Sequence, residues 1–145
     1  MSLLNELYQE IIIDHSASPR NEGRLITPTH FAEAYNATCG DELAVSLWVR
    51  GDCIMDVKFY AQGCSISKAS GSMMTEKIKY MAIGEALKFS KNFQNMLYGE
   101  DLQLLGEEAM GDLVALLGVR QFPLRVKCAT LAWHALENAL KFPVH

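Results

Sequence analysis

The sequence predicts an α+β fold in which helices pack on one face of a small antiparallel sheet. Two segments, residues 42–50 and 53–62, alternate apolar and polar residues, as is typical of strands with one buried face. After Gly63 the apolar period changes to that of a helix, and helical patterns continue almost to the end of the chain. The 145 residues are enough for one domain with its own core, so we expect residues 1–145 to form a single domain.

The N-terminal part of the chain supplies a helix, a connector and the sheet. Residues 2–15 have apolar side chains at helical spacing, and residues 16–29 are rich in turn formers. The segment HFAEAYNA, around residues 30–37, predicts a further strand, which makes the antiparallel sheet three-stranded. Gly51 and Asp52 suit a two-residue hairpin loop between the alternating segments. The side chains expected on the buried face of these two segments are Leu43, Val45, Leu47, Val49, Cys53, Met55, Val57, Phe59 and Ala61.

The rest of the chain predicts four helices. The first covers residues 64–81, and two more cover residues 84–97 and 106–117, separated near Gly99. Pro123 suits the first position of the last helix, which we expect to run to about Phe142. The apolar stripe of the first of these helices contains Ile66, Ala69, Met73 and Ile78.

Charge and composition argue against several classes of partner. The net charge is −4 and the pI is about 5.5, so the chain has no overall attraction to nucleic acids or anionic lipids. The N-terminus lacks a basic region followed by a long apolar run, and no segment reaches the length of a membrane span. We expect the four cysteines to be reduced thiols or metal ligands in a cytoplasmic protein.

Cys39 is the cysteine with the most suggestive neighbours. It precedes a strand, and residues i and i+2 of an extended chain face the same side, so Cys39 and Asp41 are placed to reach one ion. A turn supported by Asp41 explains the same residues equally well. Cys53, by contrast, shares its predicted strand face with apolar residues and is expected to be a small core side chain.

The other two cysteines each allow two interpretations. Cys64 lies at the junction of a strand and a helix, where the helix N-terminus favours a thiolate, although a small residue in a tight corner fits as well. Cys128 lies on an apolar helical stripe, which is typical of a core thiol, yet Arg125 and Lys127 give it an electropositive setting. No pair of cysteines has CxxC spacing, so the local zinc signal is weak.

The histidines are weaker candidates for a site. We expect His30 and His145 in a loop and at the terminus, and we expect His134 to point away from Cys128. His15 ends the first helix, where a cation or a backbone hydrogen bond is the ordinary explanation.

Four separated motifs give the chain a specific resemblance to a known family. In order, they are IIIDHSASPRNEG, NATCGDELAVSL, QGCSISKASGSMMTEKI and FPLRVKCATLAWHALENAL. Together they resemble the U-type iron–sulfur cluster assembly proteins, the IscU/SufU family, over nearly the whole chain. Two features resemble the SufU branch more than the IscU branch. Lys127 stands where IscU-type proteins carry histidine, and the segment from about residue 93 to 119 is similar to an extra segment of SufU-type proteins. Ala37 departs from the proline that is usual in the family.

The resemblance implies a SufE/NifU-like fold, with a three-stranded antiparallel sheet and helices on one face. It implies a zinc site made of Cys39, Asp41, Cys64 and Cys128, and sulfur received from a PLP-dependent cysteine desulfurase of the SufS type. Asp41, a hard oxygen donor among soft thiolates, would be the most weakly bound ligand of that site. Bound thiols lose their proton, so Cys39 would be held ready to attack the terminal sulfur of a persulfide. Downstream partners would be iron–sulfur scaffolds or apo-acceptor proteins.

Two other hypotheses use the same residues. In the first, the protein is a scaffold on which iron, or a transient [2Fe–2S] cluster, is held by the four side chains and passed to apo-proteins. Ligation by four cysteines is usual for such clusters, so an aspartate in the set would make the cluster labile. In the second, the protein is a zinc-stabilised interaction module without turnover, which would unfold when zinc is removed.

Overall fold

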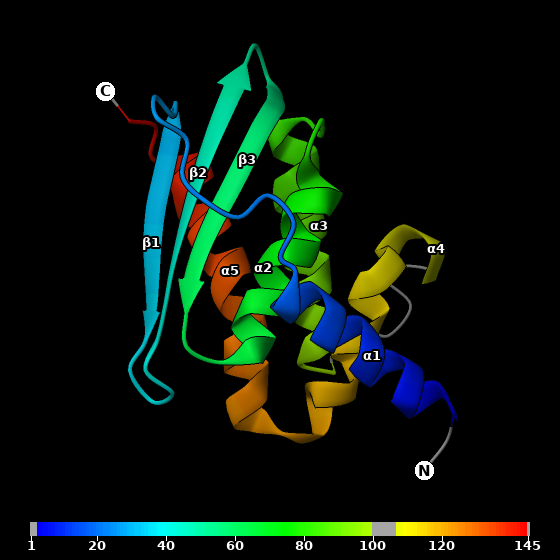
Figure 1. The fold of residues 1–145 in the computed structure, drawn as a ribbon. Helices are drawn as coiled ribbons and strands as arrows, with labels where there is room; N and C mark the ends of the chain where they lie inside the picture. The colour runs from blue at the N-terminus through cyan, green and yellow to red at the C-terminus, as the bar shows by residue number, and fades with distance from the viewer. Residues whose placement is uncertain (1–2, 100–106, 145) are drawn as a thin grey trace.

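The computed structural model of the chain describes residues 3–99 and 107–144, which form one sheet and the helices packed against it (Figure 1). The elements in chain order are α1 (Leu3–Ala17), β1 (His30–Asn36), β2 (Asp41–Arg50), β3 (Cys53–Gln62), α2 (Ser65–Ile78), α3 (Ile83–Leu97), α4 (Glu107–Met110), the 3₁₀ helix η1 (Gly111–Gln121) and α5 (Pro123–Lys141). The strands form an antiparallel sheet in the order β1-β2-β3, so the predicted fold class is confirmed.

Two hairpins define the register of the sheet. Asn36 pairs with Asp41 across the first turn, and Arg50 pairs with Cys53 across the second. Gly51 has a φ of +64°, the left-handed conformation that the first position of such a two-residue loop requires, which confirms the predicted hairpin. His30, predicted in a loop, is instead the buried first residue of β1.

A β-bulge alters the predicted buried face of β3. Trp48 pairs with Asp56 while its neighbour Val49 pairs with Ile54, so Met55 is the extra residue. One extra residue moves every side chain beyond it to the opposite face. Ile54 is therefore fully buried, whereas Cys53 is half-buried at the sheet margin with its Sγ 3.5 Å from the Tyr80 carbonyl oxygen. The prediction that Cys53 and Met55 share the core face of β3 is wrong.

Helices α2 and α5 cover one face of the sheet (Figure 1), and α3 packs against α5. All four residues of the predicted α2 stripe are buried. Helix α2 comes very close to β3 because Gly71 has no side chain, and a Cβ at this position would lie 2.6 Å from the ring of Phe59. On the far side of α5, Trp133 packs against Phe93 with their ring centroids 5.1 Å apart.

The predicted α-helix at residues 106–117 is for the most part a 3₁₀ helix in the described residues. Residue 106 lies outside the described residues, and the segment after it contains only the four-residue α4 followed by η1. Gly111, with a φ of +56°, separates α4 from the regular part of η1. The predicted final helix is confirmed, beginning at Pro123 and ending at Lys141.

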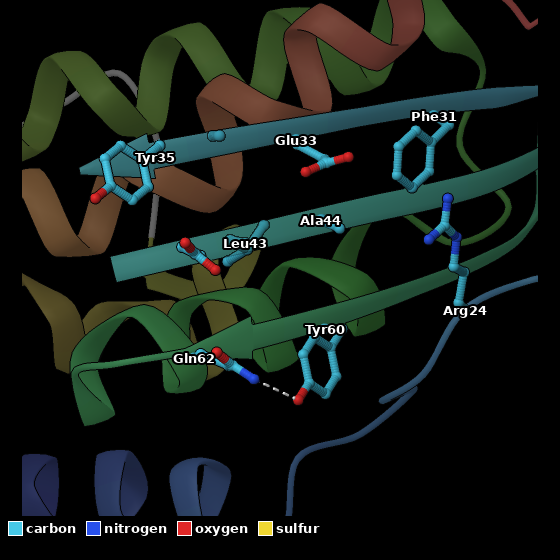
Figure 2. Close-up of a pocket in the computed structure, with 10 residues that line it drawn as sticks. Arg24, Phe31, Glu33, Tyr35, Leu43, Ala44, Tyr60 and Gln62 are labelled. Carbon is cyan, nitrogen blue, oxygen red and sulfur yellow. Dashed lines mark hydrogen bonds between the residues drawn. The ribbon is translucent and has the colours of Figure 1, made fainter. Parts of the chain in front are cut away.

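The other face of the sheet is partly covered by the connector between α1 and β1. The connector joins the β3 edge, where Gly23 N–H donates to the Phe59 carbonyl oxygen at 2.8 Å. Beside it lies a shallow groove of about 610 Å³, in which the Arg24 guanidinium stacks 4.3 Å from the ring centroid of Phe31 (Figure 2). The residues lining this groove include no cysteine. Among the helices of residues 3–99 and 107–144, none combines the length and apolar character that a membrane crossing requires.

Candidate metal centre

Three segments that are far apart in the sequence meet at the lower end of the sheet in Figure 1. They are the β1–β2 turn, the start of α2 and the first turns of α5. Cys39 lies in the turn and is exposed. Asn36 Oδ1 accepts the Thr38 N–H at 3.2 Å, and Gly40 adopts a φ of +71°, so the turn closes with Cys39 at its tip.

Asp41, the first residue of β2, is completely buried. Its Oδ1 accepts the backbone N–H of Cys64 at 2.7 Å, and its Oδ2 accepts the Ser67 hydroxyl at 2.8 Å. Gly63, with a φ of +125°, allows this close approach, because a Cβ there would overlap Oδ1. The carboxylate is therefore held by the Cys64 N–H and by Ser67 of α2, and the prediction that Asp41 merely supports a turn does not describe these contacts.

Cys64 is the N-cap residue of α2, at the predicted strand-to-helix junction. Its Sγ accepts the Ile66 N–H at 3.3 Å, so the thiol caps one of the backbone N–H groups that the first helical turn leaves without a partner within the helix. The side chain is half-buried. Both sequence-based interpretations fit this position, since Cys64 caps a helix in a tight corner and also lies next to Asp41 through its own N–H.

Cys128 is buried on α5 with its Sγ 3.6 Å from the Sγ of Cys39. Burial is the main reason that the pKa of Cys128 is raised, and the hydrogen-bonding groups of Asp41 and Cys39 raise it further. Arg125 and Lys127 are both exposed. The expected electropositive setting is therefore outweighed by burial and by acidic neighbours, and Cys128 is both a core thiol and a neighbour of Cys39.

The side chains of Cys39, Asp41 and Cys128 converge, with one potential ligand atom from each lying within 4.8 Å of the other two. Cys64 does not belong to this group, and it contacts the group through its backbone N–H, which donates to Asp41 Oδ1. The structure thus brings together three of the four residues predicted from the sequence. Two thiols and a carboxylate are a donor set that zinc accepts, and a neighbouring third thiol would complete four-fold coordination.

His15 belongs to a second group, which the sequence did not indicate. The side chain is completely buried, with Nδ1 2.7 Å from Ser72 Oγ and Nε2 2.8 Å from Asp112 Oδ2. Glu76 is the third member of this group, 3.9 Å from Nε2. These hydrogen bonds join α1, α2 and η1, which accounts for the group. Both ring nitrogens of His15 bond to side chains, in place of the backbone hydrogen bond that the sequence suggested. His134 is exposed, and His145 lies outside the described residues.

Ser67 is a second residue that the sequence analysis missed. Its hydroxyl is fully buried and reaches Asp41, which lies 26 positions earlier in the chain. Two features of the sequence could have indicated Ser67. Small polar residues recur along an otherwise apolar helix, and Ser67 follows Cys64 by three positions, which places the two on the same side of α2.

Comparisons with known proteins agree with the family resemblance that the sequence motifs indicated. Residues 7–129 match the family described as the NifU-like N-terminal domain. The zinc-dependent sulfurtransferase SufU of Bacillus subtilis (strain 168) is 43% identical over 137 residues, which cover 94% of this chain and 91% of that protein. The iron–sulfur cluster assembly scaffold protein IscU of Streptococcus pyogenes serotype M1 is 38% identical over 141 residues, covering 97% of this chain and 87% of that protein.

A solved structure supports the same grouping. A protein from Fervidobacterium islandicum AW-1, proposed to be an iron–sulfur cluster assembly scaffold for the SUF system, superimposes with a TM-score of 0.85. It is 37% identical, and the match covers 94% of this chain and 98% of that one. The N-terminal part of a NifU-like protein from Brucella abortus, with a TM-score of 0.83 and 20% identity, shares the fold.

Proposed function

The chain belongs to the NifU-like N-terminal domain family, and from this premise we propose that it acts in iron–sulfur cluster biogenesis as a zinc-dependent sulfur acceptor. The donor would be the persulfide of a PLP-dependent cysteine desulfurase of the SufS type, in the cytoplasm, and the recipients would be iron–sulfur scaffolds or apo-acceptor proteins. The observation that carries the proposal is the convergence of Cys39, Asp41 and Cys128 within 4.8 Å.

The residues that would hold zinc are Cys39, Asp41, Cys64 and Cys128, with the whole chain acting as one domain. Bound zinc would keep the thiols deprotonated and shield them from oxidation. Three thiolates and one carboxylate suit this metal, although the carboxylate is a harder donor than closed structural sites usually contain.

Cys39 would be the sulfur acceptor, because it is exposed at the tip of a turn whereas Cys128 is buried on α5. Its thiolate would attack the terminal sulfur of the desulfurase persulfide. A new S–S bond then forms on Cys39 while the S–S bond of the desulfurase breaks, and the desulfurase cysteine leaves as a thiolate with the electron pair. The exchange needs no external oxidant or reductant.

Mass spectrometry after incubation with desulfurase and free cysteine tests the proposal. The wild-type protein should gain one sulfur atom on Cys39, and the Cys39→Ala variant should gain none. Cys53→Ala is the matched control, because Cys53 is a half-buried free thiol outside the converging group. Undiminished sulfur transfer to the Cys39→Ala protein, or loss of transfer in the Cys53→Ala protein, contradicts the assignment.

A scaffold role is the second candidate, favoured by the relatives that are named IscU scaffold proteins at 38% and 34% identity. In that role the same residues would hold a [2Fe–2S] cluster, made labile by its aspartate ligand. Anaerobic reconstitution with iron and sulfide distinguishes the two roles. A visible cluster spectrum that moves to an apo-acceptor supports the scaffold, whereas desulfurase stimulation with zinc alone supports the sulfur acceptor.

A further inference from the structure

We propose that Ser67 is a positioning residue of the metal centre, whose hydroxyl holds the Asp41 carboxylate in the orientation that a metal ion requires. This inference rests on the proposed function, since it concerns how the same centre binds its metal. Asp41 and Ser67 are both completely buried, so water does not compete for the hydrogen bond between them. A hydrogen bond to a charged oxygen in such surroundings is stronger than its counterpart in water.

The single hydroxyl proton of Ser67 has two acceptors within reach. Asp41 Oδ2 lies 2.8 Å away, and the Cys128 carbonyl oxygen lies 3.2 Å away. The carboxylate is nearer and carries the charge, so it takes the proton, and the carbonyl remains a weaker neighbour. Ser67 therefore lies between two of the predicted ligands and donates its hydrogen bond to the side chain of Asp41.

The hydrogen bonds of Asp41 leave it able to bind a metal without turning. Each carboxylate oxygen has two lone pairs. One on Oδ1 accepts the Cys64 N–H and one on Oδ2 accepts Ser67, so each oxygen keeps one for an ion. Without Ser67, Oδ2 would be a buried charged oxygen with no partner from α2, and the carboxylate would be held on one side only. Loss of a partner that orients a metal ligand typically weakens metal affinity about 10–100-fold.

Ser70 offers a matched control for a purely structural role. It lies one helical turn after Ser67 on α2, is equally buried, and also connects α2 to the α5 backbone by donating to the Ala129 carbonyl oxygen at 2.6 Å. It accepts the Trp133 Nε1–H at 3.1 Å. Ser70 makes none of the hydrogen bonds to Asp41, so Ser70→Ala removes a comparable α2–α5 connection while leaving the carboxylate in place.

The experiment measures zinc dissociation constants by competition with a chromophoric chelator, together with the visible spectra of the Co²⁺-loaded proteins. Ser67→Ala should weaken zinc binding about 10–100-fold and change the Co²⁺ ligand-field bands. Ser67→Thr, which keeps the hydroxyl, should restore much of the affinity, and Ser70→Ala should stay near the wild-type values. Equal zinc affinity in Ser67→Ala and Ser70→Ala would overturn the inference.

A double-mutant cycle separates the positioning role from a general loss of stability in Ser67→Ala. In an Asp41→Ala background there is no carboxylate to position, so adding Ser67→Ala should leave zinc affinity unchanged. A further loss of the same size as in the wild-type background would contradict the positioning role. If the wild-type protein itself binds zinc without using its cysteines, the proposed function fails. If it binds zinc through its cysteines but its zinc affinity is the same with and without the Ser67 hydroxyl, only the inference about Ser67 fails.

Discussion

Replacing Gly63 with alanine would perturb the candidate centre without removing any predicted ligand. Gly63 has a φ of +125°, in which a residue with a side chain costs on the order of 1–3 kcal/mol. The new Cβ would also overlap Asp41 Oδ1 and push the carboxylate off the Cys64 N–H. Unpairing these buried polar groups costs about 1–3 kcal/mol more. The variant should therefore lose about 2–6 kcal/mol of unfolding free energy.

Gly23 is the matched control, because its φ is +134° and the nearest atom to its Cβ position is Lys58 Cδ at 3.7 Å. Gly23→Ala should show the backbone cost alone, about 1–3 kcal/mol. Urea unfolding of both metal-free variants measures the difference, and zinc competition shows whether only Gly63→Ala weakens metal binding. Equal destabilisation by the two substitutions, with unchanged zinc affinity in both, would refute the reasoning.

Three further predictions concern the core and the histidines. Gly71→Ala should lower the free energy of unfolding in urea by about 1–3 kcal/mol, because the new Cβ would collide with the buried Phe59 ring of β3. Gly84→Ala should be neutral or stabilising, because no atom lies within 4 Å of its Cβ position. Burial lowers the pKa of His30 below its ordinary 6.5. As the pH falls, the unfolded chain therefore binds a proton at His30 before the folded chain does, and the free energy of unfolding should decrease as the pH drops below 6.5. This part of the pH dependence should disappear in His30→Gln, as unfolding curves at several pH values will show. His15→Ala should cost about 1–3 kcal/mol in the same assay, because it removes a partner of the buried Ser72 hydroxyl. The exposed His134 should tolerate alanine within about 0.5 kcal/mol, and equal costs at the two histidines would contradict this account.

Some features of the molecule follow from short stretches of sequence. The alternating pattern of residues 42–50, the loop at Gly51 and the helix that begins at Pro123 each depend on a few neighbouring residues. Backbone preferences and side-chain period act at this range, so these elements could be predicted from the sequence. Resemblance to a family added the four site residues, and the structure brings Cys39, Asp41 and Cys128 together.

Other features depend on packing between segments that are distant in sequence. The β3 bulge at Met55 puts Ile54 in the core in place of Cys53. A bulge shifts the register by one residue, and the alternation of apolar and polar residues does not reveal where that shift occurs. His15 meets its partners 57 and 97 positions away, and Ser67 meets Asp41 26 positions away. The sequence by itself determined where most of the strands and helices lie, because those preferences are local. Only the tertiary structure decided which buried polar groups pair, because a buried group takes its partner from whatever segment packs beside it.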